Sequence, residues 1–223
     1  MRRSGIVAVL LIAAAIAGLA GWRFATDWRP ALAAYPIQGI DVSADTGFVD
    51  WPTAHADGVD FAYIRATSGA DERDAQFGSN WGDAYAAGVR RGAIHVFSPC
   101  RPAVDQANNF IVTVPRTGDA LPAALALDVD PACRFVPPRA ALIGEVARFA
   151  RIVERHTGQP ILLVISPALE ARYALSRALD RPLWATGRFF APTYTSRAWR
   201  MWRANTRRIA AAEQPVGWDV VAP

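Results

Sequence analysis

Apolar segments of two kinds alternate along this chain from residue 38 onward. Short runs bounded by glycine, proline or acidic residues predict strands, and longer segments with apolar positions three and four apart predict helices. The expected strands cover residues 38–43, 61–67, 93–97, 125–130, 159–165 and 183–185, and the expected helices cover 80–91, 103–114, 139–156 and 168–177. The helix over 80–91 is expected to end at Gly92, and the stretch 199–203 fits a strand or a helix equally well. Such alternation is typical of a parallel sheet covered by helices.

Carboxylates stand at the ends of several of these strands. Asp128 and Asp130 close one apolar run, and because side chains alternate along a strand they share one face, about 7 Å apart. Two carboxylates on one face drive their pKa values apart, which suits a general acid with a charged partner, although a solvated strand end is the alternative. Asp41 ends an earlier strand and Asp219 lies near the C-terminus. Acids at the ends of different strands favour an α/β fold of the β/α barrel type, TIM-barrel-like but irregular, over an open sheet.

The N-terminus predicts a membrane-directed segment. Two arginines precede an uncharged apolar run over residues 5–21, which spans about 26 Å as a helix, near the lower limit for crossing a bilayer. A small-x-small site at residues 18–20 favours cleavage as a signal peptide, whereas Trp22 and Trp28 favour retention as a single-pass transmembrane anchor. Both alternatives place the rest of the chain on the periplasmic or extracellular side of the cytoplasmic membrane. The expected parts are a signal peptide or anchor over 1–26, a linker over 27–36 and one domain over 37–223.

The charge of the chain does not indicate nucleic-acid binding. The formal net charge is +4 and all 24 basic residues are arginine, a bias that codon composition explains. Arginines and tryptophans are interleaved over residues 197–208, as in proteins that bind single strands, but a solvated face has the same pattern. No glycine-rich phosphate loop follows any expected strand. We therefore expect no nucleic-acid partner.

The two cysteines suggest a disulfide. Cys100 and Cys133 each follow an expected strand, and if those strands are neighbours both thiols lie on the same rim, where an oxidising compartment lets them pair. Two unpaired, small hydrophobic side chains are the alternative. Together with three scattered histidines the cysteines show no spacing typical of a metal site, so we expect neither a metal nor a cofactor.

A series of short motifs runs in order along the chain. They are GIDVS at 39–43, G-x-x-D-W at 47–51, FAYIRATSG at 61–69, D-x-x-F-x-x-N at 74–80, A-G at 87–88, G-x-x-H-x-F at 92–97, Q-A-x-x-F at 106–110, D-x-D at 128–130, W-A at 184–185 and the late aspartate at 219. In this order and spacing they resemble the family 25 glycoside hydrolases, the Chalaropsis-type lysozymes, which cut peptidoglycan as N-acetylmuramidases.

The resemblance implies a lysozyme-like glycosidase that hydrolyses the β-1,4 bond from N-acetylmuramic acid to N-acetylglucosamine in peptidoglycan glycan strands. Carried over onto this chain, it makes Asp130 the counterpart of the catalytic glutamate that acts as general acid. Asp128, Asp41 and Asp219 become the neighbouring acids that stabilise the oxocarbenium-like charge or orient the acetamido group. The substrate-binding residues expected on the same basis are Arg65, His95, Trp184, Trp202 and Arg203. We expect such a domain to work as a monomer.

Three departures from the family pattern leave other functions open. Asp130 is about 1.5 Å shorter than glutamate and has a lower reference pKa, about 3.9 against about 4.3. Ile94 replaces a tyrosine, and Arg203 replaces a glutamine. A family member that binds peptidoglycan without cleaving it is therefore an alternative. A barrel glycosidase or amidase acting on another acidic polysaccharide is a third, because Arg65 and Arg203 would favour an anionic substrate.

Overall fold

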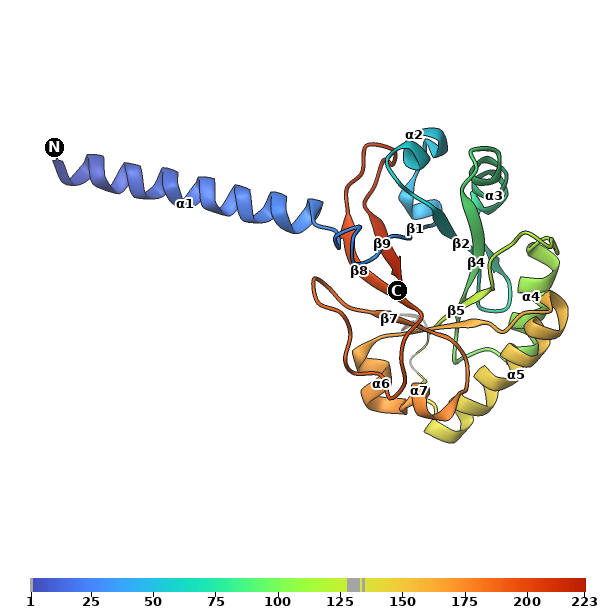
Figure 1. Ribbon diagram of the computed structural model, residues 1–223. Helices are drawn as coiled ribbons and strands as arrows, with labels where there is room; N and C mark the ends of the chain where they lie inside the picture. The colour runs from blue at the N-terminus through green and yellow to red at the C-terminus, as the bar shows by residue number, and fades with distance from the viewer. Residues whose placement is uncertain (1, 128–132, 134) are drawn as a thin grey trace.

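The computed structural model describes residues 2–127, 133 and 135–223. Its main body is a ring of strands with helices around it, from which one long helix projects (Figure 1). The strands are β1 (Gln38–Val42), β2 (Phe61–Ser68), β3 (Glu72–Arg73), β4 (Arg90–Phe97), β5 (Ala124–Leu127), β6 (Leu162–Ile165), β7 (Leu183–Thr186), β8 (Met201–Arg207) and β9 (Val216–Val221). The helices are α1 (Arg2–Asp27), α2 (Trp51–Ala56), α3 (Phe77–Ala86), α4 (Ala103–Thr113), α5 (Arg139–Thr157), α6 (Pro167–Tyr173) and α7 (Leu175–Ala178), with a 3₁₀ turn over Ala44–Thr46.

The strands close into a barrel, as the sequence predicted. Their order is β1-β9-β8-β7-β6-β5-β4-β2, and parallel pairing of β1 with β2 completes the ring, while β3 pairs only with β2. Neighbouring strands are parallel from β1 through β2 and β4 round to β8, but β9 is antiparallel to both β8 and β1. The barrel is irregular because β9 runs antiparallel to both of its neighbours and follows β8 through a short connection.

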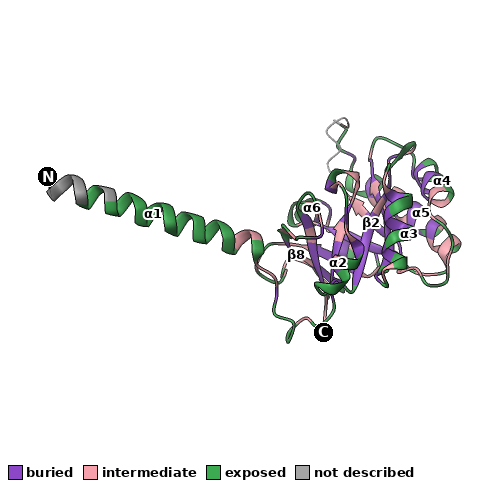
Figure 2. Ribbon diagram, turned by 90° about the horizontal axis from the view of Figure 1, so that it is seen from above, coloured by how far each residue is buried: buried purple, intermediate pink, exposed green. Residues whose placement is uncertain are grey.

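Alternation along the strands separates two hydrophobic clusters. The side chains that point into the barrel are Phe61, Tyr63, Ile94, Ala124, Leu162, Val164, Trp184 and Met201. The larger cluster lies between the outer faces of the strands and the surrounding helices. Figure 2 shows this division as buried strands within a shell of helices whose outer faces are exposed. Because both faces of most strands are covered, side chains on either face can be apolar.

Two helices differ from the prediction. The helix expected over residues 80–91 ends at Ala86, and Gly88, with a φ of 81°, takes the left-handed conformation after it. Gly92 instead lies within β4, where an added Cβ would come within 2.5 Å of the Tyr63 ring, so this glycine serves close packing inside the barrel. The helix expected over 168–177 is interrupted at Ala174, whose φ is 48°, and forms α6 and α7.

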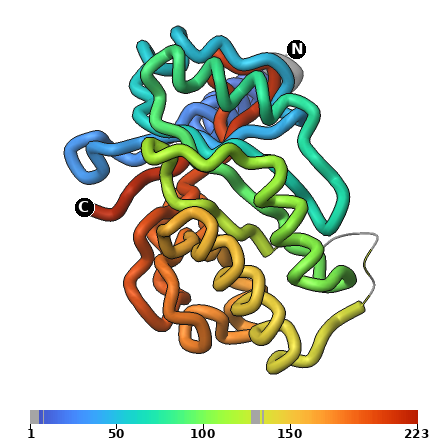
Figure 3. The backbone as a smooth tube through the Cα atoms, turned by 90° about the vertical axis from the view of Figure 1, so that its right-hand side faces the viewer, coloured from blue at the N-terminus to red at the C-terminus, as the bar shows by residue number. Residues whose placement is uncertain are grey.

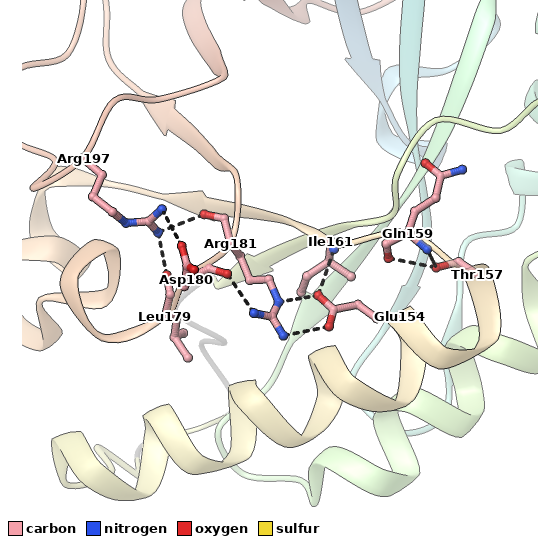
Figure 4. Close-up of polar contacts among 8 residues, drawn as sticks. All are labelled: Glu154, Thr157, Gln159, Ile161, Leu179, Asp180, Arg181 and Arg197. Atoms are coloured by element: carbon pink, nitrogen blue, oxygen red, sulfur yellow. Dashed lines mark hydrogen bonds and ion pairs between the residues drawn. The ribbon is translucent and has the colours of Figure 1, made fainter.

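The amphipathic helix α5 is held to the barrel at its C-terminal end. It lies beside α4 on the outside of the barrel (Figure 3). Near its end, Glu154 accepts a hydrogen bond from the backbone of Ile161 at 3.1 Å and forms a two-point ion pair with Arg181, in which Arg181 Nη2 donates to Oε2 at 2.8 Å (Figure 4). These contacts fasten the entries to β6 and β7, at the end of the barrel opposite the carboxyl ends of the strands.

The projecting helix α1 is the segment that the sequence assigned to the membrane. Its stretch Val9–Asp27 has a mean hydropathy of 1.7, none of it is buried, and it is long and apolar enough to cross a bilayer. A signal sequence of the same composition would form the same helix. A linker was expected over residues 27–36, but Asp27 still belongs to α1, and residues 28–36 lie against the outer face of β8 and β9.

Candidate active site

A groove crosses the barrel at the carboxyl ends of the parallel strands. One part, of about 280 Å³, is lined by Asp41, Asp45, Arg65 and Ile94 together with Ala126 and Arg203. The second part, of about 470 Å³, again includes Ala126 and Arg203, which join the two. The second part is mostly apolar, and its other lining residues include Leu127, Phe135, Val164, Leu169, Tyr173 and Thr186. A groove with a polar half and an apolar half suits a substrate that has both kinds of surface.

Two of the predicted acids meet in the polar half. Asp41 comes from β1 and Asp219 from β9, which pair in antiparallel register with Gly39 opposite Asp219. The Asp41 side chain keeps 20% of its surface exposed toward the groove, whereas that of Asp219 is completely buried. Burial, followed by the charge of Asp41 and a hydrogen bond with its side chain, raises the pKa of Asp219 well above its usual range, even though Arg203 and the Trp184 indole act in the opposite direction. The buried Asp219 carboxyl, which lies beneath Asp41, therefore holds its proton to higher pH than an exposed aspartate does.

Arg203 is the cation of this site. Its Nη2 lies 2.7 Å from Asp41 Oδ2 and its Nε lies 3.7 Å from Asp219 Oδ1. The guanidinium carbon stands 5.2 Å from the centre of the Trp184 ring, in a cation–π arrangement. The positive charge thus compensates Asp41 at the point where the two halves of the groove meet.

Two aromatic side chains lie inside the barrel beneath the acid pair. Trp184 is fully buried inside the barrel, and its Nε1 donates a hydrogen bond to Asp219 Oδ1 at 3.1 Å. The ring of Tyr63 lies 4.9 Å from that of Trp184, and its hydroxyl donates to the Pro122 carbonyl at 3.0 Å. Burial, and then the charge of Asp219, raises the pKa of Tyr63, which stays neutral. Trp184 thus positions the acid pair from below, a role different from the sugar contact expected for it.

Arg65 lies in the polar half of the groove and is held by two carboxylates. Its Nε donates to Asp74 Oδ2 at 3.0 Å and its Nη2 to Asp45 Oδ2 at 2.8 Å. Burial acts to lower the pKa of Arg65, but the hydrogen bonds and charges of Asp74 and Asp45 outweigh it and raise the pKa. Asp74 also accepts a hydrogen bond from the Ala44 backbone at 2.8 Å, which fixes the loop beside the groove.

His95 lies outside the groove, on the opposite face of β4. It is completely buried; its Nδ1 is 2.7 Å from Thr67 Oγ1, its Nε2 is 3.2 Å from Gln106 Oε1, and its ring stacks on Phe149 at 4.7 Å. Burial lowers its pKa to about 4, so the imidazole is neutral. The sequence-based assignment of His95 to substrate binding does not fit this position, because the side chain has no surface that a substrate can reach.

Trp202 also points away from the groove. It is 2% exposed on the outer face of β8, where its ring packs near Trp28, Tyr35 and Trp199. Its neighbour Arg203 points inward, because successive side chains of a strand alternate. Trp202 therefore holds the segment after α1 and does not face a substrate.

The remaining acids of the prediction, Asp128 and Asp130, lie outside the described residues. The described part of β5 ends at Leu127, which lines the groove. Cys133 is joined to Cys100 by a disulfide with a Cα–Cα distance of 5.7 Å, which confirms the predicted pair. Among the residues that the structure describes, no group of three or more histidine, cysteine or acidic side chains is placed to hold a metal ion.

Sequence and structure comparisons identify the family. The model of the glycosyl hydrolases family 25 matches residues 40–206. The chain belongs to this family. Over 196 residues it is 30% identical to the uncharacterized protein YegX of Escherichia coli K12, covering 84% of this chain and 70% of that protein. Over 63 residues it is 44% identical to lysozyme M1 of Streptomyces globisporus, covering 28% of this chain and 21% of that protein. The structure of a family 25 glycosyl hydrolase from Bacillus anthracis matches with a TM-score of 0.79 at 25% identity, covering 88% of this chain and 92% of that one.

The described geometry of this family 25 barrel defines what its acid pair can do. Glycoside cleavage requires one protonated and one ionised carboxyl group at the bond. Asp219 has no surface in the groove and contacts the groove only through its neighbours Asp41 and Arg203. Asp41 faces the groove beside Arg203 and is placed to stabilise positive charge or to accept a hydrogen bond from a sugar.

Proposed function

We propose that this protein is a lysozyme-like muramidase, which hydrolyses the β-1,4 bond from N-acetylmuramic acid to N-acetylglucosamine in peptidoglycan. The observation that carries the proposal is the Asp41–Asp219 pair, compensated by Arg203, at the mouth of a family 25 barrel. Asp130 is the proposed general acid, because it follows β5, whose Ala126 and Leu127 line the groove, and because Asp219 is too deeply buried to deliver a proton. Asp128 is proposed as the second rim acid that orients the substrate.

We also propose that α1 stays attached and anchors the domain on the outer side of the cytoplasmic membrane. The uncharged run over residues 5–21 supports this, and so do the lack of any buried residue in Val9–Asp27 and the disulfide, which is typical of exported proteins. The partners are then glycan strands and the lipid bilayer, and each protein works as a monomer.

The decisive experiment is a product analysis with the full chain in detergent. Purified peptidoglycan is digested, and the released fragments are reduced with borohydride and identified by mass spectrometry. A muramidase leaves reduced N-acetylmuramic acid at the new chain ends, and this is the expected result. Reduced N-acetylglucosamine at those ends would replace the proposed bond specificity with that of a glucosaminidase.

A second function is supported by Arg203. Arg203 forms an ion pair with Asp41 at 2.7 Å, so this carboxylate of the groove already has a partner. In addition, Asp130 stands where the family has its glutamate. A protein that binds peptidoglycan without cutting it would keep the groove and tolerate both changes. Such a protein would sediment with insoluble peptidoglycan and release no fragments, whereas the proposed muramidase both binds the polymer and releases fragments.

A further inference from the structure

The end of helix α1 is fastened to the barrel by a buried side chain of β8. Asn205 is 1% exposed, and its Nδ2 donates hydrogen bonds to the carbonyls of Ala25 and Trp28, both at 2.9 Å. Arg188 Nη2 donates to the Asn205 Oδ1 at 3.3 Å. Carbonyls at the end of a helix have no partner within the helix, so these bonds satisfy them and fix the direction in which α1 leaves the domain.

The residues after α1 are packed against the barrel as well. The Trp28 ring lies 5.3 Å from Phe189 and 6.3 Å from Trp202. Tyr35 stacks on Trp199 at 6.4 Å, and Gln38 Nε2 donates to the carbonyls of Pro30 and Tyr35. The segment between α1 and the barrel is therefore fixed to the barrel surface, so the orientation of α1 determines the orientation of the domain.

The distance from the apolar part of α1 to the barrel is short compared with the thickness of a bilayer. The uncharged run ends at Trp22, before Arg23. From Trp22 to Trp28 the helix rises about 9 Å, whereas each interfacial layer of a bilayer is about 5–8 Å thick. If α1 spans the membrane, the barrel surface around Trp28 lies at the level of the lipid headgroups.

That surface combines arginines with an exposed aromatic residue. Phe190 is 83% exposed. It follows Phe189, whose φ of 67° is disfavoured for a phenylalanine. This turn places the Phe189 ring on Trp28, while the Phe190 ring faces outward. Arg188 is exposed beside them, and Arg29 and Arg207 both lie over the Trp218 ring, at 5.4 and 4.4 Å. Exposed Arg208 follows Arg207.

We propose that this surface, formed by Arg29, Arg188, Phe190, Arg207 and Arg208, docks on anionic phospholipid headgroups and holds the barrel in one orientation on the membrane. The proposal rests on the membrane anchoring proposed above. Arginines near an anionic leaflet contribute about 1 kcal/mol each, which is about a fivefold change in the ratio of docked to undocked protein per arginine. An aromatic ring such as that of Phe190 is favoured in the interface.

The docked orientation has a consequence for the groove. Figure 1 shows the ring of strands end-on, and α1 lies in the plane of the picture. In Figure 2 the strands run vertically, and α1 again lies in the plane of the picture. The helix is thus roughly perpendicular to the barrel axis. With α1 upright in a bilayer, the groove opens sideways along the membrane, so the enzyme reaches glycan only in the layer next to the lipid surface.

Spin labelling of the full chain in lipid nanodiscs tests the docking. Both native cysteines are in the disulfide, so Phe190→Cys introduces a free thiol that is labelled without reductant. Val112→Cys is the matched control, because Val112 is 66% exposed on α4, on the side of the barrel away from α1. Accessibility of the label to oxygen, which concentrates in lipid, is compared with accessibility to a water-soluble nickel chelate.

In phosphatidylcholine discs containing phosphatidylglycerol, the label at position 190 is expected to be open to oxygen and shielded from nickel, while the label at 112 is open to nickel. Replacing Arg188 and Arg208 by Gln should lower the ratio of shielded to unshielded label at 190 about fivefold per arginine, whereas Arg151→Gln, on the exposed face of α5, should leave it unchanged.

Two results would overturn the docking while leaving the anchor intact: a nickel-accessible label at 190 in anionic discs, or shielding that ignores both lipid charge and the arginine replacements. Shielding only after addition of peptidoglycan fragments would assign the surface to glycan and also overturn it. A chain that does not stay in the discs would refute the anchor itself. None of these results depends on the fragments released in the activity assay, so a failure of the proposed activity would be recognised separately.

Discussion

Asp41 and Gly217 face each other across the β1–β9 ladder, and the Asp41 carboxylate occupies the space that a side chain at 217 would need. A Cβ added to Gly217 would lie 1.8 Å from Asp41 Oδ2 and 3.0 Å from Arg203 Nε. A glycine inside a strand often marks such a close approach. Because Gly217 has no side chain, Asp41 can turn toward Arg203 and Asp219. The geometry of the acid pair therefore depends on this glycine.

Gly217→Ala should therefore displace Asp41 from Arg203 and lower the rate of peptidoglycan cleavage by at least tenfold. We expect overpacking to cost about 1–3 kcal/mol of folding free energy. Gly144→Ala is the control, because Gly144 lies in α5 with nothing within 4 Å of the added Cβ; it should stabilise the helix by about 0.5–1 kcal/mol and leave the rate unchanged. Rates and melting temperatures check both. An unchanged rate in Gly217→Ala would remove Asp41 from the mechanism.

Asp130→Asn removes the proton that the proposed general acid transfers. The expected loss of turnover is about 10²–10⁴-fold, with the fold retained because the two side chains have nearly the same size. Asp130→Glu should equal or exceed the native rate, since it restores the reach of the family's glutamate. If Asp130→Asn cleaves as fast as the native protein, the general acid is another residue, and Asp128 becomes the candidate.

Buried Asp219 should make the fold less stable as the pH rises. Its pKa in the folded protein is raised above the value of 3.8 that applies when unfolded, so the folded state holds the proton more tightly. The resulting stabilisation is complete below pH 3.8 and is lost as the pH rises through the folded pKa, by about 1.4 kcal/mol per unit of pKa difference. Asp219→Asn should flatten this part of the melting-temperature profile, measured from pH 4 to 9. An equally steep decline in the variant would contradict a protonated Asp219.

His95 should act in the opposite direction at lower pH. Burial lowers its pKa from 6.5 to about 4, so the unfolded chain binds the proton more readily. Its contribution is complete above pH 6.5 and is lost as the pH falls toward 4, up to about 3 kcal/mol. His95→Gln should be less stable at pH 7 yet lose less stability between pH 6.5 and 4, as chemical denaturation at several pH values would show. The same loss in both proteins would mean that His95 does not titrate in this way.

The disulfide closes a loop with a sequence separation of 33 residues. In the chain-entropy model, its loss should destabilise the domain by about 3–4 kcal/mol. The double variant Cys100→Ser and Cys133→Ser should show this cost in denaturant unfolding, and the single variants should behave like it. Native protein alkylated without reductant should carry no adduct in intact-mass analysis; two adducts would show that the bridge is not formed.

The sequence was informative where a local pattern determines local structure. The apolar spacing of 139–156 predicted α5, and the acids near the ends of different expected strands predicted a barrel of the β/α type, which the strand order confirms. It was misleading at Gly92, where a glycine that resembles a helix end instead makes room for Tyr63 inside the barrel. It also missed the roles of Tyr63 and Gly217, although a glycine two positions before Asp219 in a short strand is a signal for a close contact.

By itself, the sequence determined the alternation of strands and helices and the apolar N-terminal helix, since these depend on periodicity and composition. Only the tertiary structure decided which of two neighbours faces the groove. His95 and Trp202 point outward while Ile94 and Arg203 point inward, and strands covered on both faces carry apolar side chains on each, so polarity does not reveal the inner face. Closure of the ring decided which acids meet. It brings β9 beside β1, and so Asp219 lies under Asp41 although the two residues come from opposite ends of the domain's sequence.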